Sequence, residues 1–324
     1  MKAPDFWYKT PSETPFWLKP LSWLYWLVSH FRHLWAYPLE PEIPVICVGN
    51  IVMGGGGKTP MALYLYEKLK PKFSNIAILS RGYGGKERGP VFVDKETHTA
   101  LDVGDEPLLF ARRNCTVIVA KNKKAGVKYA QDHGVDCLIM DDGYQNPHVF
   151  KSVHILMVDS RGFGNGHQFP AGPLRELIPS ALEKANFIIT RGKLSNKNDI
   201  QAIKAAQKPV YPMAYTVKKA PNPDHKYIAF AGIADPRKFH DTLTQQKINV
   251  VEFMPYGDHH AYTAEDFNTL QSKATQQAAK LITTEKDFVR FTKDQQKHLN
   301  IVEINAQIKN EDQFLEEISA LLGF

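Results

Sequence analysis

The apolar residues between positions 44 and 192 fall into short continuous runs that alternate with stretches of helical periodicity. These runs are PVICVGN, NIAILS, TVIVAKN, DCLIMDD, VHILMVDS and ANFIITRG. Continuous apolar runs of this length are typical of strands that are buried on both faces. Such strands form a mostly parallel sheet with helices on each side, so the pattern predicts an α/β/α sandwich.

A second unit is predicted after the pattern changes. Residues 208–225, KPVYPMAYTVKKAPNPDH, contain several prolines, and we interpret them as an extended linker or β-ribbon. Further strands are predicted in KYIAFAGIADP, INVVEFMPYGDHH, KLITTEKD and HLNIVEIN, with helices between them. The predicted division is an N-terminal helix over 1–36, a core unit over 37–207, the linker over 208–225 and a second, smaller α/β/α unit over 226–324.

The N-terminal segment has a composition of its own, because it holds all five tryptophans of the chain: Trp7, Trp17, Trp23, Trp26 and Trp35. The stretch without a charged residue runs only from Pro20 to Phe31, shorter than the roughly 20 residues that span a bilayer. No small-residue cleavage site follows it, as one would after a signal peptide. We therefore predict a helix that lies in the membrane interface, at the depth where tryptophan is favoured.

The two sides of this helix differ in character. The apolar face is formed by Leu21, Leu24, Val28, Phe31 and Trp35. The narrower polar side carries Ser22, Ser29, Arg32 and His33. The alternative to membrane contact is that this helix packs on the core of its own chain or on a second subunit.

Composition limits the class of protein and the kind of partner. The 324 residues are 43% hydrophobic and 23% charged, which is typical of a folded chain with room for two domains. A net charge of +6 and a pI of about 9.0 favour an anionic partner, either nucleic acid, acidic lipid or a phosphorylated substrate. The three cysteines, Cys47, Cys115 and Cys137, lie in or beside apolar runs without a C-x-x-C pair, so we expect reduced core residues and neither a metal site nor a disulfide.

The stretch VGNIVMGGGGKTP, residues 48–60, resembles a phosphate-binding loop. The usual pattern is G-x-x-x-x-G-K-[ST], and here Val52 stands in the place of the first glycine. The following residues, Gly54, Gly55, Gly56, Gly57, Lys58 and Thr59, complete the pattern. Because an apolar strand precedes the loop and a helical stretch follows it, we predict a nucleotide phosphate site at a helix N-terminus. The alternative is an ordinary glycine-rich turn between a strand and a helix.

Acidic residues that suit Mg²⁺ or proton transfer follow other elements. Asp141 and Asp142 end an apolar strand, as in a Walker-B motif, and Asp159 ends a similar strand as a rival. Asp105 and Glu106 in DVGDEP offer a base, although acids at this place also favour a helix start.

Histidines and basic residues complete the candidates for phosphoryl transfer. In GDHHAYT, either His259 or His260 could pair with a carboxylate, or could simply cap the next helix. Arg81, Arg161 and Arg175 lie in glycine-rich or post-strand loops, where a guanidinium matches phosphate. The KNKK run at 121–124 is interpreted as ordinary surface charge.

Several motifs occur in one order between residues 48 and 287: VGNIVMGGGGKTP, SRGYGG, GDEP, DDGYQN, GPLRE, DHH and TTEKD. Together they resemble the tetraacyldisaccharide 4'-kinases, the lipid A 4'-kinases of Gram-negative bacteria. The resemblance includes the altered loop with Val52. It implies a P-loop NTPase-like α/β/α core, a second α/β/α domain, a two-stranded linker and a hydrophobic N-terminal helix.

The resemblance also implies an activity. Such a kinase uses ATP and Mg²⁺ to phosphorylate the 4'-hydroxyl of a tetraacylated glucosamine disaccharide 1-phosphate, which yields lipid IVA. The implied location is the cytoplasmic face of the inner membrane, with peripheral or monotopic attachment through the N-terminal helix. Neither nucleic acid nor an obligate protein partner is implied.

The motifs carry implied roles with them. Lys58 and Thr59 would serve the nucleotide phosphates and Mg²⁺, with Glu106, Asp141 and Asp142 as further ligands of the metal or of its waters. Asp105 would be the base that removes the hydroxyl proton, paired with His259 across the cleft between the domains, with His260 as the alternative. Arg175 would stabilise the phosphoryl group in transfer.

Two other classes of protein compete with the kinase. A membrane-associated GTPase or an ATP-driven chaperone would share the loop, but TTEKD has the wrong spacing for a guanine-binding N-K-x-D motif. A nucleic-acid-binding protein would suit the basic pI, but the basic residues form no long stripe and the tryptophans lie in the apolar N-terminal segment.

Overall fold

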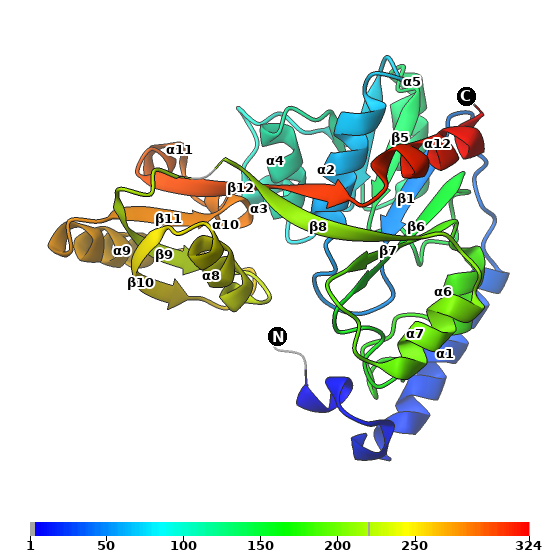
Figure 1. Cartoon of the computed structure of the whole chain (residues 1–324). Coiled ribbons are helices and arrows are strands. Elements are labelled where there is room, and N and C mark those ends of the chain that lie inside the picture. The colour runs from blue at the N-terminus through cyan, green and yellow to red at the C-terminus, as the bar shows by residue number, and fades with distance from the viewer. Residues whose placement is uncertain (1–3, 220, 324) are drawn as a thin grey trace.

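The computed structural model describes residues 4–219 and 221–323. Residues 1–3, 220 and 324, which belong to the predicted N-terminal helix, linker and second unit, lie outside the described residues. The strands join in one mixed sheet in the order β10-β9-β11-β12-β8-β7-β6-β1-β5-β2-β4-β3 (Figure 1). The prediction of an α/β chain with a large, mostly parallel sheet is therefore confirmed.

The first part of the sheet has β1 at its centre, between β5 and β6. All its neighbouring pairs are parallel except that of the short edge strand β3 with β4. The strands are β1 (Val45–Gly49), β2 (Ile76–Ser80), β3 (Val91–Phe92), β4 (Val117–Val119), β5 (Cys137–Asp141), β6 (Val153–Asp159), β7 (Phe187–Arg191) and β8 (Val210–Lys219). Every residue of β1 and β5 is buried, as expected for strands covered on both faces.

Helices cover both faces of this part, so the predicted three layers are present. One face packs on α2 (Lys58–Leu69), α4 (Asp105–Arg112) and α12 (Glu311–Leu322). The other packs on α5 (Lys123–Asp132), α6 (Ile178–Lys184) and α7 (Lys197–Ala205). The short helix α3 (Ala100–Val103) precedes α4.

The second part of the sheet is also parallel: β9 (Lys226–Ala231), β10 (Asn249–Pro255), β11 (Lys280–Thr284) and β12 (Leu299–Ile308). Its two faces pack on α9 (Ala264–Gln276) and on α8 (Pro236–Gln245). Two short helices, α10 (Glu285–Phe288) and α11 (Lys293–Gln296), connect β11 with β12.

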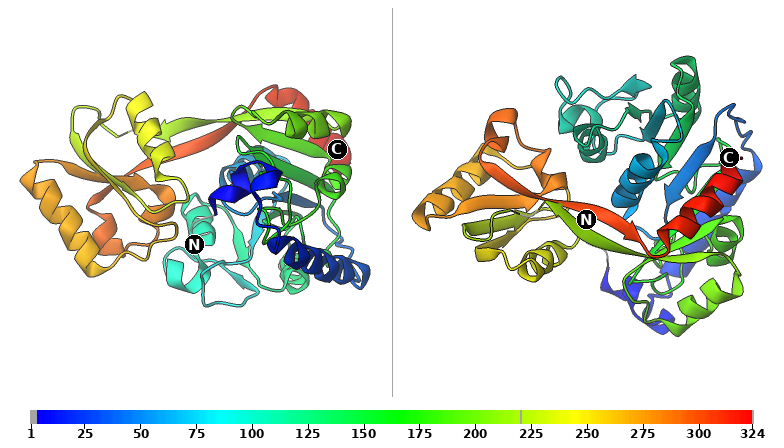
Figure 2. Two further views of the ribbon diagram at one scale, coloured as in Figure 1. Left: turned by 90° about the horizontal axis from the view of Figure 1, so that it is seen from below. Right: turned by 45° about the horizontal axis from the view of Figure 1, so that its top comes forward.

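An antiparallel pair, β8 with β12, joins the two parts (Figure 2). The proline-bearing segment 208–225 thus contains one strand of a ribbon whose other strand comes from the C-terminal region. The C-terminal helix differs from the predicted division, which places residues 226–324 together. Phe314 and Ile318 of α12 lie in the core of the first part, because β12 leads the chain back across the ribbon.

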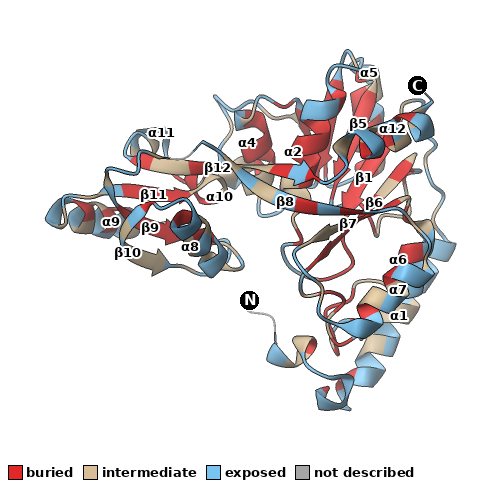
Figure 3. Ribbon diagram, in the orientation of Figure 1, coloured by how far each residue is buried: buried red, intermediate tan, exposed pale blue. Residues whose placement is uncertain are grey.

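Helix α1 (Leu18–Leu34) follows two short 3₁₀ helices, η1 (Asp5–Tyr8) and η2 (Pro11–Glu13). The side that carries Ser22 and Tyr25 contacts the protein: Ser22 Oγ donates to the carbonyl of Gln168 at 2.7 Å, and Tyr25 Oη to that of Arg175 at 3.4 Å. Arg32 and His33, predicted for the polar side, are exposed. The residues predicted for its apolar face are all exposed: Leu21, Leu24, Val28, Phe31 and Trp35. Figure 3 shows exposed and intermediate residues along α1. Within the described ranges, no helix has the length and apolar character needed to cross a bilayer.

Candidate active site

The glycine-rich loop between β1 and α2 has the form of a phosphate cradle. Gly54 and Gly57 adopt φ values of +105° and +86°, in the left-handed region that favours glycine. A Cβ at Gly56 would lie 2.7 Å from Asn50 Nδ2, because the Asn50 amide fills the loop and donates to the carbonyl of Val52 at 2.8 Å. Gly57 is the N-cap of α2, so the free N–H groups of that helix open toward the loop and favour an anion there.

Val52 has a packing role at the position where the strict pattern requires glycine. Its side chain is 8% exposed and lies in a core cluster with Ile51 and Leu174. Its backbone also forms an isolated antiparallel bridge with Leu174. The bridge braces the start of the loop against the segment that carries Arg175, which follows Leu174 directly.

Lys58 spans the loop from the first turn of α2. Its Nζ lies 3.1 Å from Asn50 Oδ1 and 3.0 Å from Asp142 Oδ1. Thr59 follows it in the same turn, so both residues lie at the edge of the sheet where β1 and β5 end.

Asp141 and Asp142 have opposite electrostatic environments. Burial raises the pKa of Asp141 to about 7, and the charge of Glu106 adds to the effect. Asp141 Oδ1 is buried and has no hydrogen-bond partner in the part of the chain that the structure describes. Burial also opposes ionisation of Asp142, but Lys58 and Arg175 outweigh it and lower the pKa of Asp142 to about 2.

Arg175 reaches the same place from the loop after Leu174. Its Nη1 lies 3.0 and 3.1 Å from the two carboxylate oxygens of Asp142. Asp142 itself has φ of +52°, an uncommon conformation for a residue other than glycine, and its N–H donates to the carbonyl of Val48 at 3.0 Å. The turn after β5 therefore directs this carboxylate toward the side chains of Lys58 and Arg175.

Asp159, the rival of the Asp141–Asp142 pair, has a different partner. Arg161 contacts both of its oxygens, and Arg161 Nη2 also donates to the carbonyl of Gly55 at 2.9 Å. Arg191 Nη2 lies 3.4 Å from Asp159, while Arg191 Nε is buried without a partner among the described residues. Asp159 thus holds arginines beside the phosphate loop, and the sequence gives no sign of Arg191 in this role.

The acids predicted for Mg²⁺ do not form a preformed cage. In residues 4–219 and 221–323 there is no group of three His, Cys, Asp or Glu side chains that could hold a metal ion. Glu106 Oε1 instead lies 3.2 Å from Lys286 Nζ. Asp141 is the acid that keeps a buried oxygen without a partner.

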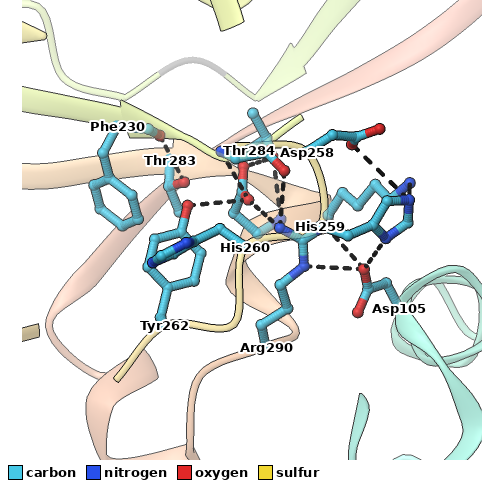
Figure 4. Close-up of polar contacts among 12 residues, drawn as sticks. Asp105, Phe230, Asp258, His259, His260, Tyr262, Thr283, Thr284 and Arg290 are labelled. Atoms are coloured by element: carbon cyan, nitrogen blue, oxygen red, sulfur yellow. Dashed lines mark hydrogen bonds and ion pairs between the residues drawn. The ribbon is translucent and has the colours of Figure 1, made fainter. Parts of the chain in front are cut away.

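Asp105 and His259 meet between the two parts of the molecule (Figure 4). His259 Nδ1 lies 3.0 Å from Asp105 Oδ2. Asp105 is the first residue of α4, whose N-cap is Gly104 with φ of +90°, so its side chain does not cap the helix. His259 has φ of +56° in the loop between β10 and α9, which turns its ring toward Asp105.

His260 points to a different partner. Its Nε2 lies 3.0 Å from Asp266 Oδ2, in the first turn of α9. Its ring packs against Tyr256 and Tyr262. The geometry therefore places His259, and not His260, beside Asp105.

Two basic residues that were not predicted for the site, one within TTEKD and one three residues after it, extend this pair. Lys286 Nζ lies 3.3 Å from His259 Nε2. An ammonium group has donors only, so Nε2 accepts and the ring proton lies on Nδ1, facing Asp105. Arg290 Nε donates to Asp105 Oδ2 at 2.9 Å. Burial would raise the pKa of Asp105, but His259 and Arg290 outweigh it and hold the pKa below its usual value.

Charged pairs hold α4 against the segment 285–290, and we call this contact the α4–α10 interface. It is formed by Asp105, Glu106 and Arg113 on one side and Glu285, Lys286 and Arg290 on the other. At its far end Arg113 binds both oxygens of Glu285, at 2.6 and 2.8 Å, and donates to the carbonyl of Ile304 at 3.0 Å. The helix that begins with Asp105 is thus fixed to the second part of the molecule at both ends.

The interpretation of KNKK as surface charge is wrong for Lys123. This side chain is 6% exposed, and its Nζ donates to the carbonyl of Leu79 at 3.1 Å. Burial lowers its pKa to about 8, against the opposing charge of Asp141. The three cysteines are buried, as predicted for core residues.

Comparison with known proteins identifies a family, relatives and a solved structure that this chain resembles. The model of the family "Tetraacyldisaccharide-1-P 4'-kinase" matches residues 14–323. A tetraacyldisaccharide 4'-kinase of Parvibaculum lavamentivorans is 41% identical over 300 residues, covering 90% of this chain and 87% of the relative. One of Bradyrhizobium diazoefficiens is 38% identical over 319 residues, covering 96% and 93%. A crystal structure of LpxK from Aquifex aeolicus in complex with ATP has a TM-score of 0.75 at 24% identity, covering 94% of this chain and 98% of that one.

Proposed function

This chain belongs to the tetraacyldisaccharide-1-P 4'-kinase family, the kinases of lipid A biosynthesis, and we propose how its residues transfer phosphate from ATP to the disaccharide. One observation carries the assignment of roles. Lys58, at the end of the phosphate loop, and Arg175 each lie 3.0 Å from Asp142 Oδ1, beside the end of β5. The positive charges that a phosphoryl group in transfer requires therefore lie together at this loop.

The phosphate loop binds the nucleotide in this proposal. The N–H groups of residues 54–59 and the Lys58 ammonium surround the β- and γ-phosphates. Because Lys58 contacts Asp142 and Asn50, its ammonium is already directed across the loop. Arg175, held by the same Asp142, supplies positive charge to the phosphoryl group in transfer.

The residues at the end of β5 fit Mg²⁺. Asp141 offers a buried oxygen without a partner, and a cation beside it would relieve the desolvation that raises its pKa. Mg²⁺ is commonly held by one or two carboxylates together with substrate phosphates, so a set of three acids is not required. We assign it to Asp141 and the Thr59 hydroxyl, with Glu106 and Asp142 nearby as ligands of its waters. When bound, the ion neutralises charge on the phosphates.

Asp105 accepts the proton of the 4'-hydroxyl in this proposal. Its lowered pKa keeps the carboxylate ionised at neutral pH, so it is ready to accept a hydrogen bond from the hydroxyl. Phosphoryl transfer passes through a loose transition state, in which orientation of the nucleophile matters more than the strength of the base. His259 donates from Nδ1 to the carboxylate and fixes it from the side of the second unit.

The membrane-embedded substrate explains the exposed face of α1. The side of α1 that faces the protein contacts the loops of the site, through Tyr25 to the Arg175 carbonyl and Arg32 to the Gln145 carbonyl. Gln145 in turn donates to the carbonyl of Asn50 in the phosphate loop. If α1 lies in the interface of the inner membrane on its cytoplasmic side, the acylated disaccharide reaches Arg175 without leaving the bilayer.

Transfer of ³²P from labelled ATP to the disaccharide 1-phosphate in detergent micelles tests this function. Wild type should label the lipid. Lys58→Ala should reduce labelling by about 10²-fold or more, because the positive charge of the ammonium beside the transferring group is lost. Hydrolysis of ATP by wild type without labelled lipid would reject the proposal in favour of a switch or chaperone.

A further inference from the structure

We propose that Arg290 is a positioning residue for Asp105, and this inference rests on the proposed function of Asp105 as the base. Arg290 Nε donates to Asp105 Oδ2 at 2.9 Å, and Nη2 lies 2.8 Å from the same oxygen. Nη2 is not aligned for a second hydrogen bond, so its contribution is that of an ion pair. His259 Nδ1 reaches Oδ2 as well, at 3.0 Å.

All these contacts fall on one carboxylate oxygen. Asp105 Oδ1 accepts no hydrogen bond from the described residues, since each recorded partner of the side chain is on Oδ2. A carboxylate held through one oxygen by donors from two directions has a defined plane, and its second oxygen has a defined direction. Arg290 therefore leaves Oδ1 oriented for the acceptor hydroxyl.

Arg290 can do this because it is itself fixed. Its side chain is 6% exposed, and Nη1 lies 2.6 Å from Asp287 Oδ1 and 3.0 Å from the carbonyl of Gly232. Asp287 is fully buried and also accepts from the Gly232 N–H, at 3.0 Å, and from Tyr262 Oη, at 3.1 Å. In Figure 4, dashed lines join Asp105 to both Arg290 and His259.

The same network holds the other partner of the base. The carbonyl of Gly232 accepts from Arg290 Nη1 and from the backbone N–H of His259, both at 3.0 Å. A Cβ on Gly232 would lie 3.0 Å from Tyr262 Oη and 3.1 Å from Asp287 Oδ1, so the backbone approaches this network closely. One backbone carbonyl thus sets the spacing between the two groups that bind Oδ2.

Asp105 in this orientation receives the hydroxyl proton during transfer of the γ-phosphoryl group. The acceptor oxygen forms a bond to the γ-phosphorus while the bond from that phosphorus to the β–γ bridging oxygen breaks, and its electron pair leaves with ADP. The hydroxyl proton passes to Asp105 Oδ1 and is later released to water. Arg290 touches none of the reacting atoms and acts only through Asp105.

A purely structural role for Arg290 is the competing explanation, and Arg113 provides the matched control. Both arginines are nearly buried, with side chains 6% and 9% exposed, and both join α4 to the segment 285–290. Arg113, however, binds Glu285 at the opposite end of α4 from the base. Loss of either arginine should weaken the α4–α10 interface, whereas only loss of Arg290 should release Asp105.

The experiment measures kcat and both KM values in the micelle assay for Arg290→Lys, Arg290→Gln and Arg113→Gln, together with thermal unfolding. We expect kcat to fall about 30- to 100-fold in the folded Arg290 variants, because a misplacement of about 1 Å can cost that much. KM for ATP should change less than about threefold, since Arg290 does not contact the phosphate loop. Arg113→Gln should keep kcat within about threefold of wild type at a comparable loss of Tm.

A second readout does not depend on stability. In Arg290→Ala, millimolar guanidinium should restore part of the lost kcat by occupying the place of the side chain, and it should leave the kcat of Arg113→Ala unchanged. The inference is overturned if a folded Arg290 variant retains kcat within about threefold of wild type, or if Arg113→Gln loses as much kcat as Arg290→Gln.

Asp105→Asn in the same assay separates this inference from the proposed function. If Asp105→Asn is as active as wild type, the role of Asp105 is wrong and the proposal for Arg290 fails with it. If Asp105→Asn is inactive while the Arg290 variants are normal, only the positioning role is rejected.

Discussion

In most folded proteins apolar side chains are buried and charged ones are exposed. Helix α1 and the α4–α10 interface both depart from this distribution, each in its own way. On α1, Trp23, Val28 and Trp35 are 63%, 62% and 74% exposed. In the α4–α10 interface, the side chains of Arg113 and Glu285 are 9% and 13% exposed. One region presents apolar surface to solvent, and the other encloses charge.

The two regions differ in what burial or exposure of these side chains contributes to the fold. An exposed apolar face adds nothing to the stability of the folded chain in water, because its side chains gain no packing, but it marks a contact surface. A buried ion pair loses hydration, so it stabilises the fold weakly unless both partners are present and well bonded. Neither arrangement contributes much to the stability of the folded chain.

Removal of the charge at the catalytic end of the α4–α10 interface should have the largest effect. Asp105→Asn keeps the shape of the side chain but leaves a poor proton acceptor, so kcat should fall about 10²- to 10⁴-fold. ATP binding, measured by titration calorimetry, should remain near that of wild type, because Asp105 lies on α4 and not on the phosphate loop. Weaker ATP binding with normal turnover of the bound complex would contradict the role as base.

At the other end of the interface, loss of one charge should reduce stability. Arg113→Leu leaves Glu285 buried without its partner, and the free energy of unfolding should fall by about 3–5 kcal/mol. The double variant Arg113→Leu, Glu285→Leu should lose less than the single one, because no unpaired charge remains. Urea unfolding of the variants measures both. A double variant that is less stable than Arg113→Leu would show that the pair contributes more than its desolvation costs.

On α1, the removal of apolar side chains should affect membrane binding and leave stability unchanged. Trp23→Gln, Val28→Asn and Trp35→Gln should each weaken partition into anionic phospholipid vesicles by about tenfold. Their free energies of unfolding should stay within about 0.5 kcal/mol of wild type, because these side chains are exposed. Leu101→Gln is a matched control, since Leu101 is 66% exposed in a different region. Equal partition of all four variants and wild type would reject the membrane contact.

The smallest effect is expected from an exposed ion pair near the same interface. Lys293 Nζ lies 2.7 Å from Glu96 Oε2, with side chains 65% and 67% exposed. Lys293→Ala should lower the free energy of unfolding by less than about 1 kcal/mol, because water and salt screen such pairs. A loss as large as that of Arg113→Leu would mean that burial does not decide how much these ion pairs contribute to the free energy of unfolding.

Much of the local structure could be predicted from the sequence. The run DCLIMDD predicts a buried strand that ends in acids, and β5 ends at Asp141. The glycines before Lys58 predict a loop with positive φ at a helix N-terminus, and Gly57 is found there. Hydrophobic periodicity and glycine act over a few residues, so they can be recognised without knowledge of the rest of the chain.

The state of each charged side chain could not be predicted in this way. Asp141 and Asp142 are neighbours in sequence, yet the pKa of one is raised and that of the other lowered. Lys123 belongs to a basic run but is buried beside Leu79, because in the folded chain the first residue of α5 lies next to the end of β2. These differences depend on which elements lie next to each residue.

Local patterns in the chain are enough to predict the strands, the phosphate loop and, through the resemblance of its motifs, the family. The groups that contact the base depend instead on the fold, since His259 and Arg290 lie 154 and 185 residues from Asp105. The fold also decided that the side of α1 that carries Ser22 rests on the protein and that the predicted apolar side is exposed. The physical reason is that an ionic contact has no local period: its partner is set by the path of the backbone, and its strength by how far folding excludes water from the pair.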